Sequence, residues 1–143
     1  IRKSIKNMNS REFELFIGFL FELKGYKVEV TKPTVDMGRD IIISTDDGDI
    51  FIECKHYDDN TFVGRPVIQK LLGSMIMFKA TKGIIINTGQ YHKNAIEASK
   101  MVNNLELWNE HDIINLIKEL DTTQILRYLD YDREIWEAKE IKN

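Results

Sequence analysis

Cysteine and long apolar runs are nearly absent from this chain of 143 residues. Its one cysteine, Cys54, excludes an internal disulfide, so we expect a reducing compartment such as the cytoplasm. No apolar run approaches the roughly 20 residues that span a membrane, and no membrane partner is expected. Repeats and low-complexity segments are also absent. The chain has no initiator methionine, so Ile1 is expected to be a processed or excised start.

The composition is that of an ordinary folded domain. Hydrophobic residues make up 43% and charged residues 30% of the chain, which excludes the disordered class. The formal net charge of −3 disfavours a general polyanion binder. Residues 1–103 nevertheless carry 15 basic against 13 acidic side chains, whereas residues 104–143 carry 5 against 10. Any surface for nucleic acid is therefore expected on the first part, as a local patch.

Apolar periodicity predicts an α/β fold in the order α-β-β-β-α-β-α-β-α, a mixed β-sheet flanked by helices. Strands are expected over residues 26–31, 40–45, 50–55, 82–87 and 105–108. Helices are expected from Ser10 to Gly25, from Pro66 to Phe78, over 94–102, after the capping Asn109, and over 122–140. We expect one domain over residues 1–120 and a C-terminal helical extension over 121–143.

A hairpin over residues 40–55 brings charged side chains to one face. Its two β-branched runs flank Asp47-Gly48, a strong signal for a two-residue turn. With that turn, Asp40 faces Lys55, and the period of two places Glu53 on the same face. The opposite face of the hairpin, including Cys54, is almost wholly apolar and is expected to be core.

Two carboxylates beside a lysine suit phosphodiester hydrolysis, which needs a Lewis acid and an activated water. Asp40 and Glu53 would hold Mg²⁺ (or Mn²⁺), and the main-chain carbonyl of Cys54 would join them. Lys55 would orient the attacking water or neutralise developing charge. The competing interpretation is an exposed sheet face with a cross-strand ion pair, worth less than about 1 kcal/mol. Asp36 also precedes the strand, but the register favours Asp40.

Asp40 followed after twelve residues by Glu53-Cys54-Lys55 resembles the D…(D/E)-x-K signature of the restriction-endonuclease-like nucleases. More narrowly, the chain is similar to the catalytic domain of the Mrr-type restriction endonucleases. The supporting segments are Phe13-Glu14 with Gly25-Tyr26, Met37-Gly38-Arg39-Asp40, Gln69 with Leu72-Gly73, and Ala80 to Gly83 leading into Ile84-Ile85-Ile86. The resemblance covers about residues 10–120.

This resemblance implies an active site of Asp40, Glu53, Lys55 and Gln69, with Glu14 as a further acidic contributor. From its own position, Glu14 is equally well a second metal ligand or a first-turn charge favoured by the helix dipole, and Gln69 is equally well a polar helix position. Arg39 stands where the family has a small or apolar residue, and would reach a phosphate or pair with Asp36. Glu53 stands where many members have Gln, and a Glu is the better metal ligand.

Several basic side chains are candidate DNA phosphate contacts by their predicted places near strand ends and helix starts. They are Arg39, Arg65, Lys70, His92 and Lys93. For each one taken singly, solvated surface is the better explanation.

The expected function is a Mg²⁺-dependent deoxyribonuclease whose partner is DNA, with a homodimer as a further expectation. One alternative is a structure-selective nuclease similar to the archaeal Holliday-junction resolvases. A second alternative is a non-catalytic DNA-binding or assembly module of the same fold.

Overall fold

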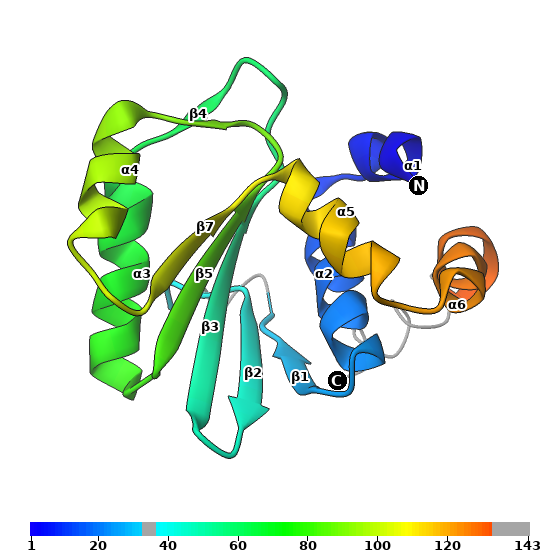
Figure 1. Cartoon of the computed structure of the whole chain (residues 1–143), viewed down its shortest axis with the longest axis horizontal. Coiled ribbons are helices and arrows are strands. Elements are labelled where there is room, and N and C mark those ends of the chain that lie inside the picture. The colour runs from blue at the N-terminus through cyan, green and yellow to red at the C-terminus, as the bar shows by residue number, and fades with distance from the viewer. Residues whose placement is uncertain (33–36, 133–143) are drawn as a thin grey trace.

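A computed structural model of the protein describes residues 1–32 and 37–132. Five strands form a mixed sheet in the order β1-β2-β3-β5-β7. β1 (Lys27–Val30), β2 (Ile41–Thr45) and β3 (Gly48–Lys55) pair antiparallel, and β5 (Lys82–Asn87) and β7 (Leu105–Trp108) continue parallel to β3. The mixed sheet flanked by helices confirms the predicted fold class (Figure 1).

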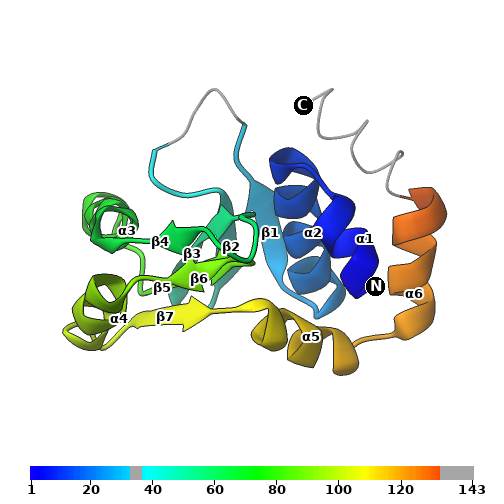
Figure 2. The ribbon, with the colours of Figure 1, turned by 90° about the horizontal axis from the view of Figure 1, so that it is seen from above.

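Helices cover both faces of this sheet (Figures 1 and 2). On one face pack α1 (Arg2–Asn7), α2 (Ser10–Leu23), α5 (Glu110–Lys118) and α6 (Thr122–Arg127). On the other pack α3 (Arg65–Phe78) and α4 (Lys93–Lys100). Each face has its own buried core, so the competing interpretation of the hairpin's charged face as an exposed sheet face is wrong. Phe51 on that face is 1% exposed, because it packs with Ile68 and Leu71 of α3.

Local signals account for most helix boundaries. Asn9, rather than Ser10, caps α2, since its side chain accepts from the Glu12 N–H and Glu12 reciprocates. Asn109 and Asp112 make the same capping box at α5, which confirms the predicted start of that helix. After α2 the chain turns through Gly25 at a φ of 109°.

The hairpin register differs from the prediction by two residues. Asp46-Asp47 form the turn, Thr45 pairs with Gly48 and Ile41 pairs with Ile52. Gly48 instead opens β3 at a φ of 119°, and a side chain there would collide with Thr81. Because the shift is by two, every side chain keeps its predicted face.

Two short strands were not expected from the sequence. β4 (Phe62–Val63) and β6 (Gln90–Tyr91) pair parallel as a separate ribbon beyond the ends of β3 and β5 (Figure 2). α1 was also not expected. Its Ile5 is 1% exposed and belongs to the core on the α2 face.

The beginning of the acidic C-terminal segment is part of the core. α6 continues as a π-helix, Tyr128–Asp132, and the Tyr128 ring stacks on Phe19 with a centroid separation of 4.2 Å. Ile125 is 0% and Tyr128 1% exposed, so this part is not an appendage. The division at residue 120 stays a prediction, and the expected helical residues 133–140 lie outside the described part. No described helix has the length and apolar character that a membrane crossing requires.

Candidate active site

Asp40 lies just before β2 and is held tightly by backbone bonds. Its Oδ2 accepts a hydrogen bond of 2.7 Å from the Cys54 N–H, and its own N–H donates to the Ile52 carbonyl at 2.8 Å. Its carbonyl accepts from the N–H and Oγ1 of Thr31 at 2.8 and 3.1 Å. The predicted pairing with Lys55 is wrong, because β2 pairs with β3 two residues nearer the turn. The Asp40 carboxylate instead accepts the hydrogen bond of the Cys54 N–H, in place of a backbone carbonyl of β2.

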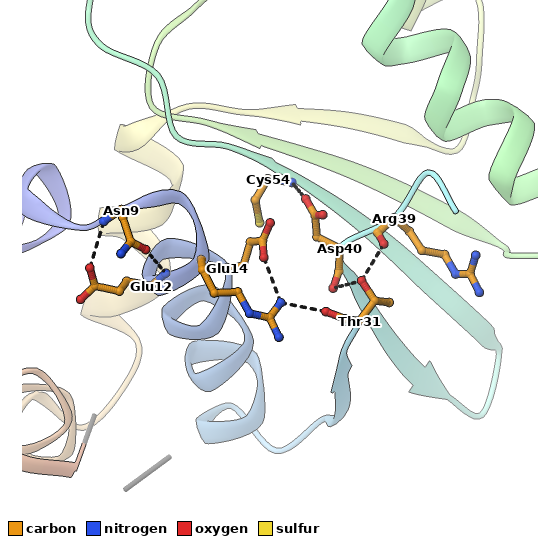
Figure 3. A network of polar contacts seen from close by, with 8 residues as sticks. Asn9, Glu12, Glu14, Thr31, Arg39, Asp40 and Cys54 are labelled. Atoms are coloured by element: carbon orange, nitrogen blue, oxygen red, sulfur yellow. Dashed lines mark hydrogen bonds and ion pairs between the residues drawn. The ribbon is translucent and has the colours of Figure 1, made fainter. Parts of the chain in front are cut away.

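Glu14 of α2 points toward this carboxylate from the α2 face (Figure 3). Burial raises its pKa to about 7, helped by the negative charge of Asp40 and a hydrogen bond with it. Arg11 opposes this rise: its Nη1 donates to Glu14 Oε2 at 3.0 Å and to the Thr31 carbonyl at 2.8 Å. Glu14 is therefore near half-protonated at neutral pH, as expected for two carboxyl groups that share a site.

Glu53 lies on the opposite face of β3, toward α3, and is 3% exposed. A carboxylate buried to this degree requires compensation by hydrogen bonds or positive charge. Lys55 follows on the same face at the end of the strand and is half-buried.

The pKa of the buried Cys54 thiol is influenced by the charged side chains around it. Burial raises its pKa, and the charges of Asp40, Glu14 and Glu53 raise it further, while Lys55 lowers it. Glu53 and Lys55 are the neighbours of Cys54 in β3, and the Asp40 carboxylate accepts from the Cys54 N–H. The cysteine is itself 8% exposed, which confirms its prediction as a core residue.

The donor set suits a hard cation that keeps water in its shell. Within the described residues, no group of three or more His, Cys, Asp or Glu side chains is placed to hold a metal ion. Asp40 and Glu53 with one carbonyl would leave several positions to water and phosphate oxygens, which is how Mg²⁺ usually binds. Two carboxylates and a carbonyl, with water in the remaining positions, therefore fit this ion.

Arg39 does not project toward open solvent near the carboxylates. Its guanidinium carbon lies 4.0 Å from the ring centroid of Phe78 and 4.8 Å from that of Phe51. Two aromatic rings thus lie beside this cation, and its contact with phosphate stays a prediction. The alternative partner, Asp36, lies outside the described residues. Through its contact with Phe78, Arg39 links the segment before β2, which includes Asp40, to the end of α3.

Gly38 brings the same segment against the middle of α3. A methyl group added to it would lie 3.0 Å from Ser74 Cβ and 3.1 Å from the Lys70 carbonyl, and its φ is 84°. Lys70 therefore lies beside the segment that leads to Asp40. Gln69, one residue earlier on α3, is exposed, and its role stays a prediction.

Arg65 and Lys93 begin α3 and α4, and both are exposed. The two helix starts adjoin, because the Arg65 N–H donates to Asn94 Oδ1 at 3.3 Å. His92 caps α4, and its Nδ1 accepts from the Asn94 N–H at 3.2 Å. The structure thus gathers these three basic residues, while their contact with phosphate stays a prediction.

Four residues of the site were not expected from the sequence. Arg11 and Thr31 brace Glu14 and Asp40, and only the tertiary fold brings them together (Figure 3). Asn87 is 0% exposed at the end of β5, in register with Lys55. The sequence signal for Asn87 was its place as a polar residue directly after the apolar run Ile84-Ile85-Ile86. His56 stacks on Phe13 at a centroid distance of 4.7 Å.

A hollow of about 380 Å³ opens beside His56, between α1 and the start of α5. Lys6, Asp58, Asp59 and Glu110 line it, so its polar wall is mainly acidic. None of the proposed metal ligands lines it. The carboxylates, not this hollow, therefore define the candidate site.

Comparison with known proteins identifies the family of this chain. Residues 5–117 match the family model of the Mrr catalytic domain, described as restriction endonuclease. The chain belongs to this family. A relative, the uncharacterized protein y4cE of Sinorhizobium fredii, is 29% identical over 98 residues, which make up 66% of this chain and 25% of that protein.

Three solved structures share the fold. The DNA modification-dependent restriction endonuclease AspBHI has a TM-score of 0.68 at 23% identity, over 90% of this chain and 37% of that one. AF1548, a protein of unknown function, has a TM-score of 0.64 at 15% identity, over 78% and 66%. MspJI, solved with a 27-mer oligonucleotide, has a TM-score of 0.59 at 13% identity, over 86% and 29%. The matches to y4cE and to these three structures therefore cover between a quarter and two thirds of the length of those proteins.

Proposed function

We propose that this domain is a metal-dependent DNA endonuclease. The observation that supports it best is the hydrogen bond of 2.7 Å from the Cys54 N–H to Asp40 Oδ2, which holds the Asp40 carboxylate beside Glu53-Cys54-Lys55. Membership of the restriction endonuclease family and the arrangement of donors both favour phosphodiester hydrolysis. DNA is the proposed substrate, in a reducing, DNA-containing compartment such as the cytoplasm.

Asp40 and Glu53 would hold Mg²⁺ (or Mn²⁺) with the Cys54 carbonyl, and Glu14 would contribute to the same site. The metal would polarise a phosphate oxygen and lower the pKa of a bound water. Lys55 would orient that water and stabilise charge on the scissile phosphate. The Cys54 N–H and Thr31 fix Asp40 in position before any ligand arrives, so the site would need little rearrangement.

The test is cleavage of plasmid DNA with Mg²⁺ by the wild type and by Glu53→Gln and Lys55→Met. Each variant should lose activity by about 100-fold or more, since each removes a charged group at the reacting phosphate. Mn²⁺ binding, measured by calorimetry, should weaken in Glu53→Gln and persist in Lys55→Met. Glu97→Gln, an exposed carboxylate of α4, is the matched control and should cut like the wild type.

Equal cutting by the wild type and Lys55→Met would contradict the proposal, as would the absence of Mn²⁺ binding. The substrate panel should include linear, methylated and four-way-junction DNA. Cleavage confined to the junction would favour the resolvase-like alternative. Binding of DNA without cleavage under any metal would favour the non-catalytic alternative.

A further inference from the structure

The β4–β6 ribbon presents an aromatic side chain at the edge of the sheet where the candidate site lies. Phe62 is 53% exposed, although its strand neighbour Val63 is 1% exposed and buried. The ribbon begins seven residues after Lys55 and pairs with the segment that follows Asn87. Phe62 therefore belongs to the chain segment that follows the end of β3, where Lys55 lies.

Hydrogen bonds hold the ribbon in place, so the fold itself keeps Phe62 exposed. The buried Asn87 donates from Nδ2 to the Gln90 carbonyl at 2.9 Å and accepts from the Gly89 N–H at 2.8 Å. The Tyr91 hydroxyl contacts the carbonyls of Ile85 and Trp108 at 3.0 and 2.5 Å. These bonds join β6 to the ends of β5 and β7, and β6 in turn holds β4.

Gly89 shows how closely the ribbon is packed. A side chain there would meet the Thr61 carbonyl at 2.5 Å and the Asp58 carbonyl at 2.9 Å. Gln90 Nε2 also donates to the Asp59 carbonyl at 2.8 Å. The segment that carries Phe62 is thus fixed on both sides. A side chain carried on a fixed backbone segment requires no ordering of that segment when it binds a partner.

Cations flank this aromatic residue. Arg65 lies three residues after Phe62, and Lys93 lies two residues beyond Tyr91, the pairing partner of Val63. Both are exposed, and the Arg65–Asn94 bond holds their helix starts together. The nearby acidic side chains have other contacts: Asp58 accepts from Thr61 Oγ1, and Asp59 lies 3.9 Å from Lys6.

We propose that Phe62, Arg65 and Lys93 form a DNA-contacting edge, in which the ring packs into a groove of the duplex against base and sugar while the two cations bind phosphates. This inference rests on the proposed function, since it takes DNA as the substrate. An exposed aromatic ring beside phosphate-binding cations is the arrangement with which proteins hold nucleic acid without reading its full sequence. The edge would position the strand whose phosphate reaches Lys55.

The test is binding of a fluorescent duplex to the full chain in EDTA, followed by anisotropy, so that cleavage does not interfere. Phe62→Ala should weaken affinity by about 5- to 100-fold, the range of one lost aromatic contact with a base. Phe62→Tyr should bind like the wild type. Ile76→Ala is the matched control, because Ile76 is 80% exposed but lies near the far end of α3.

Salt dependence separates the ring from the cations. Arg65→Ala should lower the slope of log K against log salt by about 1, whereas Phe62→Ala should leave the slope unchanged. Wild-type affinity in Phe62→Ala, a loss no larger than that of Ile76→Ala, or no duplex binding by the wild type would overturn the inference. Phe62-dependent binding without cleavage in Mg²⁺ would support this edge and contradict the nuclease proposal. Cleavage with unchanged binding by Phe62→Ala would do the reverse.

Discussion

Glu14 of α2 points toward Asp40, which lies in the segment before β2, and burial together with the negative charge of Asp40 raises the pKa of Glu14 to about 7 (Figure 3). The pair lies beside the Cys54 N–H, and Arg11 braces its Glu14 side (Figure 3). Such a pair is costly when both groups are ionised, unless a cation neutralises them. This relationship makes the stability of the metal-free protein and its affinity for a cation depend on the same groups.

The first prediction concerns pH and Glu14→Gln. The pKa of Glu14 is about 7 in the folded protein and 4.5 ordinarily, so between these values the folded state binds more protons than the unfolded state. The stability of the metal-free wild type should therefore fall as pH rises from about 4.5 to 7, and then level off. The loss is on the order of 3 kcal/mol. Glu14→Gln should remove this loss while it weakens Mn²⁺ binding.

Urea unfolding in EDTA at pH 5 and pH 8 measures this effect. Glu22→Gln, an exposed carboxylate on the same helix, serves as control and should retain the wild-type pH dependence. Identical pH dependence in the wild type and Glu14→Gln would show that Glu14 is not the group responsible.

The second prediction concerns Arg11. Arg11→Met removes the donor to Glu14 and to the Thr31 carbonyl, at a cost of about 1–2 kcal/mol in the free energy of unfolding. Because the positive charge lowers the pKa of Glu14, its loss should raise that pKa further. The pH midpoint of Mn²⁺ binding should move upward, and Arg11→Lys should restore part of the shift. Calorimetric titration at several pH values measures this midpoint. The same midpoint in Arg11→Met and the wild type would contradict the prediction.

The third prediction concerns the cation held by two rings. Arg39→Ala and Phe78→Leu should each destabilise the protein, and the double variant should lose less than the sum. A double-mutant cycle in urea should give a coupling of about 0.5–2 kcal/mol, because the single contact is at 4.0 Å and partly shielded from water. Mn²⁺ affinity should fall in Arg39→Ala, since this contact fixes the residue before Asp40. Additive effects would mean that the contact contributes nothing.

The fourth prediction concerns α6. Tyr128→Ala should destabilise the domain by about 3–5 kcal/mol, because its ring is 1% exposed and stacks on Phe19. Leu126→Ala, with Leu126 44% exposed on the same segment, should cost little. Thermal unfolding of both variants separates a core helix from a dispensable extension. A small effect of Tyr128→Ala would restore the view of residues 121–143 as an appendage.

The alternation of residues 40–55 determined which side chains share a face, and that assignment survived an incorrect register. A shift of two residues leaves a period of two unchanged, whereas the partner of Asp40 depends on where Gly48 is required. Gly48 is required at the start of β3 because Thr81, 33 positions later, lies against it. No pattern within the hairpin contains that information.

Helix caps, buried strands and the family's ordered segments were likewise readable along the chain, because they depend on neighbours within a few residues. Other features needed the assembled fold: α3 covering Phe51, Arg39 between Phe51 and Phe78, Arg11 joining Glu14 to Thr31, and the ribbon that displays Phe62. Each of these joins residues distant in sequence, and their contacts form only when long-range packing has closed the intervening loops. The sequence by itself determined the chemical groups and their faces, and the tertiary structure decided their partners, burial and protonation.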